Sequence, residues 1–549
     1  MEHGGIHAAR ALKDAGVSMI FALPGGHILS LFEGCRLEGI RIVDTRHEEG
    51  ATMAALGWAL ATGEVGVAAV TAGPGVTNAF PGVAEARGAG APLALIAGKT
   101  GLRQHGRGAV QDLDQLTVMR PVTTWAQTCM KAERIPHFVA EAIHRARSQP
   151  PGPVFLDIPQ DVFMQPAELP PTASGYPEED LRAAPRGADL ERAVELLRGA
   201  ERPVIVAGGG AFWSGAGEAL TAFVERTGIP VTTTSAARGL VPDDHPLCLG
   251  SLIHGGVATA SADVVLVLGS RFNANLSYGG HPLFRPGQTL IQVDASPASV
   301  GGNRRPDLAV IADVRTFLEE ASHDGDHAEW AERCREAAAT SRASWDAQTG
   351  HRGERMNAGW LAREVATFAR SLGTHTFVCD GGDSLVWGLA FANATGPGRH
   401  LFTGTNLGTL GIGTPFALAA KAARPAEPVF LFTGDGAFGL SAMEVETAVR
   451  HDLPIVVVVV NNGGWGDVRH EQRAFYGDDA DRGALLSNMR YDLLAESFGG
   501  HGERVERPDD VEPALKRAVD AGVPAILDCL TDPDVESELI RGLADLDVM

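Results

Sequence analysis

Two glycine-rich polar stretches each follow an apolar run and could together hold a metal ion. Residues 434–436 (Gly-Asp-Gly) follow "PVFLFT", and residues 461–464 (Asn-Asn-Gly-Gly) follow "PIVVVVV". Adjacent strands of a parallel sheet bring such loops to one carboxyl edge, where open α/β folds bind ligands. Asp435, the Asn462 amide oxygen and the Gly464 carbonyl would form an all-oxygen half-shell suited to Mg²⁺. Since a divalent cation lets a carboxylate and a phosphate share a site, the pattern predicts a metal–diphosphate site.

A second candidate carboxylate follows the run "RIVDT". Glu48 comes shortly after this strand-like run and precedes "GATMAALGWALATG", a stretch of small residues typical of a buried helix. A carboxylate at a strand end can serve as a general acid or base. Taken alone, Glu48 could equally be an acidic charge that favours a helix N-terminus. We expect its neighbour Glu49 to be a solvated charge.

Short β-branched runs alternate with alanine-rich helical windows along the chain, and these elements must position the polar loops. The runs are "RIVDT", "VGVAAVTAG", "PLALIAG", "PVFLDIP", "PVIVAGGG", "DVVLVLGS", "LIQVDA", "THTFVCDGG", "PVFLFTGDG" and "IVVVVVNN". Continuous apolar strands separated by helices indicate parallel sheets covered on both faces. In "PVFLFTGDGAFGLSAMEVETAV" we expect a helix to begin near Ala437. The sequence therefore predicts an α/β protein with doubly wound parallel sheets.

Two polar segments divide the chain. Residues 165–187 are proline-rich and predict a linker, whereas residues 323–356 are charged and predict a helical connector. The predicted domains are residues 1–165, 186–325 and 356–535. Their similar sizes suggest duplication of one architecture, and 549 residues exceed what a single core fills.

The composition excludes several classes of partner. With 68 acidic and 46 basic side chains the net charge is −22, which repels nucleic acid and anionic membranes. The 6 cysteines are scattered without metal-ligand spacing, as expected for buried residues of a reducing compartment. No apolar run approaches the roughly 20 residues that span a bilayer. We expect a cytoplasmic protein.

Gly-Asp-Gly, 24 intervening residues and Asn-Asn resemble the motif of thiamine diphosphate-dependent enzymes. The resemblance covers essentially the whole chain, in the order pyrimidine-binding, middle and diphosphate-binding domain. It implies thiamine diphosphate and Mg²⁺ as cofactors, with Asp435, Asn462 and the Gly464 carbonyl on the metal. It also implies that Glu48 is the catalytic glutamate at the aminopyrimidine ring. In relatives these two halves come from different subunits, which implies at least a homodimer and favours a homotetramer.

The resemblance assigns further residues to the cofactor. The loop "TAGPGVTN" (71–78) would lie near the pyrimidine. In "GTNLGTLGIG" (404–413), Gly408 would offer a carbonyl to the amino group and Leu410 would be an apolar wedge. In "CDGGDS", Gly382 and Asp383 would reach the diphosphate. The other cofactor-binding residues implied are Gly434, Asp435, Gly436, Ala437, Asn462, Gly464, Trp465 and Gly466.

Three further residues carry a finer resemblance, to the group of benzaldehyde lyase and 2-hydroxyacyl-CoA lyase. His27 in "LPGGHI" and Gln111 in "GAVQDLDQ" would line the reacting ring and pass protons or bind a substrate oxygen. Glu471 in "GGWGDVRHEQR" stands where acyl-CoA lyases of this group carry a glutamate that could accept a hydroxyl proton. Alternatively, His27 is a capping or core residue and Glu471 is a solvated charge.

The middle domain resembles that of oxalyl-CoA decarboxylase and 2-hydroxyacyl-CoA lyases, where it binds an ADP moiety. The segment that carries this resemblance is "GSRFNANLSYGGHPLFRPGQTLIQVDASPASVGGN". There Arg271 would suit a phosphate and Asp294 a ribose hydroxyl. The resemblance therefore allows ADP as a further ligand.

Taken together, the resemblance implies a lyase acting on a small molecule, an acyl-CoA. It would cleave a 2-hydroxyacyl-CoA to formyl-CoA and an aldehyde or ketone, and the reverse reaction would be an acyloin-type condensation. A benzaldehyde-lyase-like enzyme on free 2-hydroxy ketones and an acetolactate-synthase-like carboligase that consumes pyruvate are alternatives. An inactive, cofactor-binding regulatory relative is a fourth, against which the presence of Glu48 argues.

Overall fold

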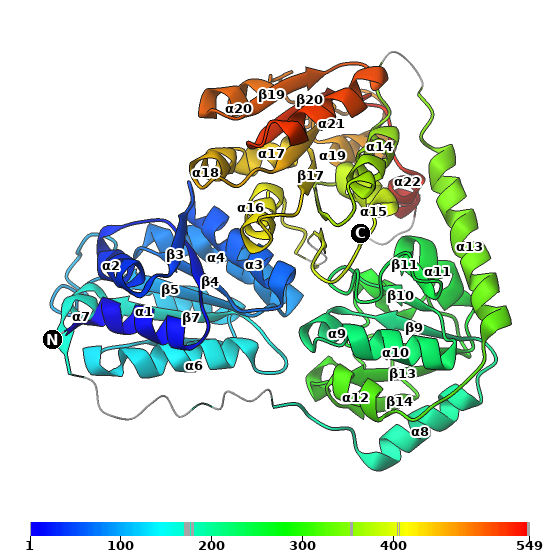
Figure 1. Cartoon of the computed structure of the whole chain (residues 1–549), viewed down its shortest axis with the longest axis horizontal. Coiled ribbons are helices and arrows are strands. Elements are labelled where there is room, and N and C mark those ends of the chain that lie inside the picture. The colour runs from blue at the N-terminus through cyan, green and yellow to red at the C-terminus, as the bar shows by residue number, and fades with distance from the viewer. Residues whose placement is uncertain are drawn as a thin grey trace. The chain divides into compact units, whose positions relative to one another are not determined.

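The structure is a computed structural model of the chain and describes residues 2–168, 176, 181–351, 355–402, 405 and 407–545. The chain forms two compact units. One comprises Met1–Arg182 with Leu407–Thr409, and the other comprises Ala183–Asn406 with Leu410–Met549. Figure 1 labels the helices and strands.

The first unit contains a six-stranded parallel sheet in the order β3-β2-β4-β5-β7-β6. Its strands are β2 (Met19–Ala22), β3 (Arg41–Asp44), β4 (Gly66–Val70), β5 (Leu93–Lys99), β6 (Trp125–Thr128) and β7 (Val154–Pro159). Its helices are α1 (Gly4–Asp14), α2 (Leu29–Glu38), α3 (Glu48–Thr62), α4 (Pro74–Ala89), α5 (Gln115–Met119), α6 (Ile135–Arg147) and α7 (Gln160–Met164). The short strands β1 (Glu2–His3) and β8 (Pro166–Ala167) pair antiparallel beside it.

The second unit begins with a middle domain whose parallel sheet has the order β11-β10-β9-β12-β13-β14. Its strands are β9 (Pro203–Ala207), β10 (Val231–Thr233), β11 (Cys248–Ser251), β12 (Val264–Leu268), β13 (Thr289–Asp294) and β14 (Leu308–Ile311). Its helices are α8 (Gly187–Arg198), α9 (Gly209–Trp213), α10 (Gly217–Thr227), α11 (Leu252–Ser261) and α12 (Val314–Glu320). The charged connector forms a long helix, α13 (Ala328–Ala347), as predicted.

The last domain has a third parallel sheet, in the order β16-β15-β17-β18-β20-β19. Its strands are β15 (Thr376–Asp380), β16 (His400–Leu401), β17 (Val429–Gly434), β18 (Val456–Asn461), β19 (His501–Val505) and β20 (Ala525–Leu530). Its helices are α14 (Ala358–Ser371), α15 (Asp383–Phe391), α16 (Gly413–Ala423), α17 (Asp435–Ser441), α18 (Glu444–Arg450), α19 (Gly466–Tyr476), α20 (Asp492–Phe498), α21 (Val511–Asp520) and α22 (Glu538–Asp545).

One predicted helix boundary is wrong. The helix after the Gly-Asp-Gly motif begins at Asp435, two residues before Ala437, and it is interrupted at residues 442–443. The earlier start places the Asp435 backbone in the first turn of α17, with its carboxyl group at the helix N-terminus.

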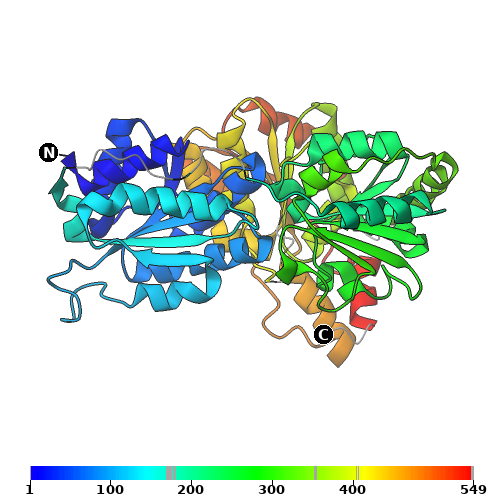
Figure 2. The ribbon, with the colours of Figure 1, turned by 90° about the horizontal axis from the view of Figure 1, so that it is seen from below.

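The three sheets confirm the predicted fold class, and helices cover both faces of each sheet (Figures 1 and 2). When the strands of each six-stranded sheet are numbered along the chain, the first and last sheets share the order 2-1-3-4-6-5. The middle sheet instead has the order 3-2-1-4-5-6, which is the order of dinucleotide-binding folds. The suggested duplication is therefore visible in two of the three domains.

The middle and last domains share a buried polar contact. Arg238 is 3% exposed, and its guanidinium donates to Asp243 at 2.6 Å and to the Ala392 carbonyl at 3.1 Å. It also donates to Nδ1 of His400 at 3.3 Å. Since a buried charge needs such partners, these bonds tie the two domains into one unit.

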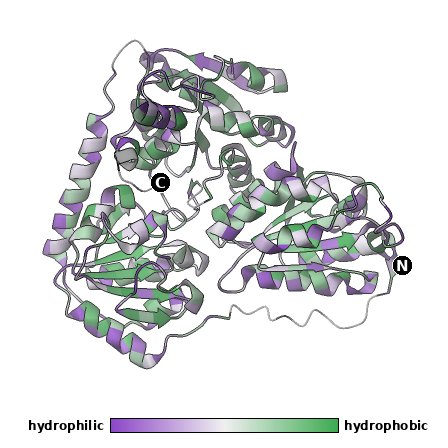
Figure 3. Cartoon of the chain, turned by 180° about the vertical axis from the view of Figure 1, so that it is seen from behind, coloured by the Kyte–Doolittle hydropathy of each residue, from purple (hydrophilic) through white to green (hydrophobic). Residues whose placement is uncertain are grey.

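The strands are the most apolar elements, as the green colouring in Figure 3 shows. Each sheet contributes to a core of buried aliphatic and aromatic side chains. All six cysteines are buried and unpaired, as expected from their spacing. Within the described ranges, every helix is too short or too polar to cross a membrane.

Candidate active site

The two glycine-rich motifs meet at one carboxylate. Asp435, only 1% exposed, follows β17, and its Oδ1 accepts the backbone N–H of Gly436 at 3.0 Å. Its Oδ2 accepts the N–H groups of Gly463 and Gly464, beyond the adjacent strand β18, at 3.0 and 3.1 Å. The Asn462 side chain turns back, and its Oδ1 accepts the Gly464 N–H at 3.1 Å. The structure thus brings the predicted metal-binding residues together.

Burial sets the electrostatics of this carboxylate. It raises the pKa of Asp435 to about 7, although the three backbone donors favour the ionised form. A cation beside the carboxylate would offset the free-energy cost of burying its negative charge. Among the described residues no three His, Cys, Asp or Glu side chains gather as a metal cluster. The oxygens of Asp435, Asn462 and Gly464 therefore stay the predicted ligand set for Mg²⁺.

Asp383 lies beside these residues, at the start of α15. A Cβ atom added at Gly466 would lie 2.6 Å from Asn462 Nδ2 and 2.7 Å from Asp383 Oδ2. Asp383 is 8% exposed; within the described part of the chain its Oδ1 has no hydrogen-bond partner, and its Oδ2 faces the His470 ring. A buried carboxylate oxygen without a partner needs a cation or a hydrogen-bond donor, which Mg²⁺ or its bound water would supply. The residues present therefore fit a magnesium-bound diphosphate.

His470 is a charged partner that the sequence pattern did not reveal. Its Nδ1 lies 3.1 Å from Asp383 Oδ2, and its Nε2 lies 3.0 Å from the Pro533 carbonyl. Because both ring nitrogens face acceptors, the doubly protonated, charged ring is the form that can donate to both. Burial lowers the pKa of His470, but the contact with Asp383 outweighs it and raises the pKa above the usual value.

Glu471, predicted to take part in catalysis, lies on α19 four residues after Asp467. Burial and the charges of Asp383 and Glu471 raise the pKa of Asp467 to about 7. Glu471 is itself half-buried. It therefore belongs to a partly buried group of carboxyls at the metal loop, which disfavours the alternative of a solvated charge.

On the pyrimidine side, Glu48 is the first residue of α3 and is 6% exposed. Asn78 Nδ2 donates to its Oε2 at 3.1 Å, and its Oε1 faces Gly75. Asn78 belongs to the "TAGPGVTN" loop but carries no signal of its own in the sequence. Glu49, expected to be solvated, is instead half-buried, and burial raises its pKa. The reason is its place in the first turn of a helix that packs on the sheet.

His27, Thr71 and Gln111 form a chain of side chains at the ends of β2 and β4. The Thr71 hydroxyl donates to Gln111 Oε1 at 3.3 Å and lies 3.2 Å from His27 Nδ1. Since the hydroxyl proton points to Gln111, the hydroxyl accepts from His27, so Nδ1 carries the imidazole proton. Burial lowers the pKa of His27 and keeps the ring neutral near pH 7. Nε2 is then a free base, as a proton-transfer role requires.

The predicted segment 404–413 is only partly described, because Gly404 and Asn406 lie outside the described residues. Gly408 has a left-handed backbone with φ of 63° and is exposed. Leu410 is half-buried. Gly408 belongs to the first compact unit and Leu410 to the second. Their roles at the pyrimidine stay predictions.

In the middle domain, Arg271 follows β12, and Asp294 is the last residue of the neighbouring strand β13. Asp294 Oδ1 accepts the Ser296 N–H at 2.9 Å; burial raises the Asp294 pKa and the Arg271 charge opposes the rise. Where strand order reverses, between β9 and β12, Gly210 N–H donates to the Gly269 carbonyl at 2.8 Å. Open α/β sheets bind ligands at such a reversal. ADP binding here stays a prediction.

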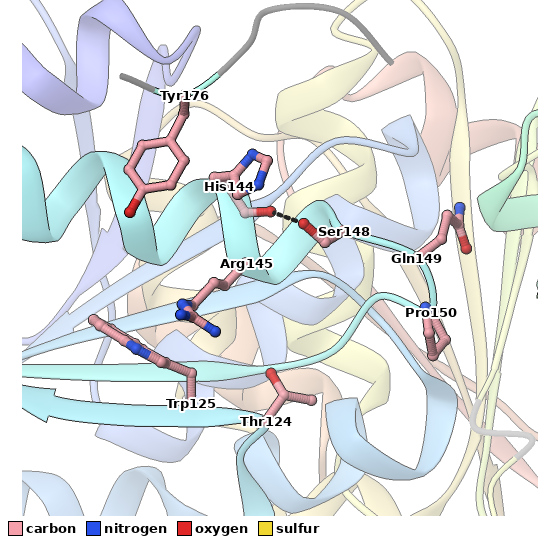
Figure 4. A pocket seen from close by; sticks show the side chains of 8 residues that line it. All are labelled: Thr124, Trp125, His144, Arg145, Ser148, Gln149, Pro150 and Tyr176. Carbon is pink, nitrogen blue, oxygen red and sulfur yellow. Dashed lines mark hydrogen bonds between the residues drawn. The ribbon is translucent and has the colours of Figure 1, made fainter. Parts of the chain in front are cut away.

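An open pocket of about 350 Å³ in the first unit lies away from these side chains. It is lined by Thr124, Trp125, His144, Arg145, Ser148, Gln149, Pro150 and Tyr176 (Figure 4). Thr124 precedes β6 and Pro150 precedes β7, so the pocket opens at the amino edge of the sheet. Glu48 and His27 follow strands at the carboxyl edge. The pocket is therefore separate from the candidate active site.

Comparisons with known proteins agree with this geometry. Three family models match: thiamine pyrophosphate enzyme N-terminal binding domain at residues 3–118, central domain at 190–321 and C-terminal binding domain at 380–529. A Mycobacterium tuberculosis relative, acetolactate synthase large subunit IlvG, is 36% identical over 97% of this chain and 96% of its own. Acetolactate synthase isozyme 2 large subunit of Escherichia coli is 31% identical over 96% and 95%. The Corynebacterium glutamicum acetolactate synthase large subunit is 32% identical over 96% and 86%.

Proposed function

Because the chain belongs to the thiamine pyrophosphate enzyme family, we propose that it is a carboligase acting on a 2-oxo acid. It would decarboxylate the acid and join the retained acyl unit to a second carbonyl compound. The observation that supports this proposal is near full-length similarity to relatives named acetolactate synthases. The finer sequence resemblance favoured cleavage of a 2-hydroxyacyl-CoA, but these relatives' names favour the carboligase alternative.

Thiamine diphosphate, when bound, supplies a carbon nucleophile that can break and form bonds at a carbonyl carbon. Asp435, Asn462 and the Gly464 carbonyl would hold its Mg²⁺. Glu48 would face its pyrimidine. Because Asn78 engages Oε2 of Glu48, Oε1 is the oxygen that would exchange a proton. The neutral His27 would accept or return a proton at Nε2, with Thr71 fixing its tautomer.

A substrate panel read by mass spectrometry tests the proposal. Purified protein with thiamine diphosphate and Mg²⁺ is supplied with pyruvate alone, a short 2-hydroxyacyl-CoA, or benzoin. We expect acetolactate and carbon dioxide from pyruvate, in a ratio of one to one. Formyl-CoA as the main product would replace the proposal with 2-hydroxyacyl-CoA cleavage. Benzaldehyde from benzoin alone would indicate a benzaldehyde-lyase-like activity.

Cleavage of a 2-hydroxyacyl-CoA is the second candidate function, and the position of Glu471 beside the half-buried Asp467 favours it. Under this reading, Glu471→Ala should slow cleavage about 100-fold or more, the low end of general acid–base contributions. The loss is measured as kcat on the CoA substrate. Gln472→Ala, the next position of the same helix, is the control and should retain activity. An unchanged kcat in Glu471→Ala would remove this residue from the mechanism.

A further inference from the structure

A buried glutamine links the carboxyl ends of three strands next to the pyrimidine half of the site. Gln115, 0% exposed, is the first residue of α5. Its Oε1 accepts the Gly73 N–H, beyond β4, at 2.9 Å. Its Nε2 donates to the Gly98 carbonyl in β5 at 3.0 Å and to Asp157 Oδ2 in β7 at 3.2 Å.

These partners leave the amide one orientation. A backbone N–H only donates and a backbone carbonyl only accepts, so exchanging the amide oxygen and nitrogen would break both bonds. Asp157 is 0% exposed and is itself held, because Lys99 Nζ donates to the same Oδ2 at 3.0 Å. Gln115 is thus held in one orientation, and the Asp157 carboxylate that it contacts is buried and paired with Lys99.

Gln115 is connected to the candidate catalytic side chains through the backbone of residues 71–75. Gly73 has φ of 59°, and a Cβ atom there would lie 3.0 Å from Gln111. Thr71, two residues earlier, contacts both His27 and Gln111, whereas Gly75, two residues later, lies beside Glu48. Gln111 itself has an uncommon positive φ of 62°, and it lies four residues before Gln115. Each of these contacts depends on the position of the 71–75 backbone relative to the carboxyl edge of the sheet.

We propose that Gln115 is a positioning residue that sets the 71–75 loop and, through it, the alignment of Glu48, His27 and Gln111. The proposal rests on the proposed function in one respect, namely that these three side chains serve the reaction. Gln115 touches neither the cofactor nor the substrate in this role. It acts by holding the Gly73 amide.

The test compares two methionine variants. Gln115→Met keeps the length of the side chain and removes its three hydrogen bonds. Gln288→Met is the matched control in the middle domain. Gln288 is 8% exposed, donates to the Thr259 and Ala262 carbonyls at 2.8 and 2.9 Å, and accepts the Arg285 N–H at 2.7 Å. Both variants therefore lose two donated bonds and one accepted bond; the acceptors are two backbone carbonyls for Gln288, and one carbonyl and the Asp157 carboxylate for Gln115.

We expect both variants to lower the melting temperature by similar amounts. Only Gln115→Met should speed amide hydrogen exchange in residues 71–78, by about 10-fold or more, measured by mass spectrometry. Only Gln115→Met should lower kcat by about 10-fold or more, because misaligned groups lose rate rather than affinity. The Kd for thiamine diphosphate, read by fluorescence titration, should stay within about twofold in both, since the Mg²⁺–diphosphate anchor is untouched.

The variant Gln115→Glu distinguishes a loss of loop positioning from a loss of stability. It also replaces Gln115→Met as the test if Gln115→Met does not fold. Its carboxylate still accepts the Gly73 N–H but cannot donate to Gly98 and lies beside Asp157. We expect it to be no more stable than Gln115→Met and yet more active. Activities that simply follow the melting temperatures would overturn the proposal, and so would unchanged exchange in residues 71–78.

The proposed function and the role proposed for Gln115 can be overturned independently of each other. If pyruvate is not a substrate, the proposed function falls, while kcat on whichever panel compound reacts still tests Gln115. If no panel compound reacts, the rate of hydrogen exchange in residues 71–78 alone tests the role of Gln115. If acetolactate forms normally in Gln115→Met, the positioning role falls and the proposed function stands.

Discussion

Glu48→Gln should lower kcat about 100- to 10,000-fold, the range of a lost general acid–base group. The amide keeps the shape of the side chain and can still bond to Asn78, which now approaches Oε2 at 3.1 Å. It cannot exchange a proton at Oε1. Thiamine diphosphate should remain bound, because the diphosphate anchor is unchanged. Steady-state rates with the reactive panel substrate, together with a cofactor titration, measure both effects.

Glu49→Gln is the matched control for this prediction. Glu49 lies in the same first turn of α3 and is half-buried, and burial raises its pKa. Its replacement should change kcat less than threefold. A Glu48→Gln enzyme that kept more than a tenth of its activity would show that the pyrimidine is activated by another group.

Asp435→Asn should weaken Mg²⁺ binding about 100-fold or more, since even residues behind a ligand contribute 10- to 100-fold. The amide carries no charge, and its one oxygen cannot accept all three N–H groups that the carboxylate now accepts. The loops after β17 and β18 should therefore separate. Calorimetric titration with Mg²⁺ and thiamine diphosphate measures the loss, and activity should recover in part at high Mg²⁺.

The pKa of about 7 adds a pH test for Asp435. Below this pH the carboxyl holds a proton that Mg²⁺ must displace, so affinity should fall as the pH is lowered through 7. Asp435→Asn should lose this dependence. Asp313→Asn, which changes a buried helix-capping carboxylate of the middle domain to an amide, is the control and should leave the Mg²⁺ affinity unchanged. Equal Mg²⁺ affinities in the wild type and Asp435→Asn would exclude Asp435 as a ligand.

Local pattern was enough to predict the most apolar strands and the meeting of the two motif loops, but not the shorter or less apolar strands such as β6, β10 and β16. Every apolar run quoted for the fold lies in a strand, because buried parallel strands carry continuous apolar residues. The meeting at Asp435 followed because β17 and β18 are consecutive strands that pair directly.

The sequence pattern could not predict the order of the strands in each sheet or the polar contacts between residues far apart in the chain. Similar strand–helix repeats produced two different sheet orders, since the apolar runs do not say which neighbours pair. Gln115 and Asp157 are 42 positions apart, and His470 and Asp383 are farther apart still. Neither pair has a spacing that would mark it. Residues that bind a shared cofactor also say little about the substrate, so the finer resemblance favoured a different reaction from the one the relatives' names support.

The common strand order of the first and last sheets makes the loops after their third strands equivalent. In one copy this loop is Thr71–Gly75, and in the other it is Gly434–Gly436. An ancestor with a single such domain could have surrounded a ligand only by pairing with itself, offering the same loop to both ends. The present chain has divided that labour: one descendant keeps an acid for a cation, and its sibling has become a proline-bearing support for proton exchange.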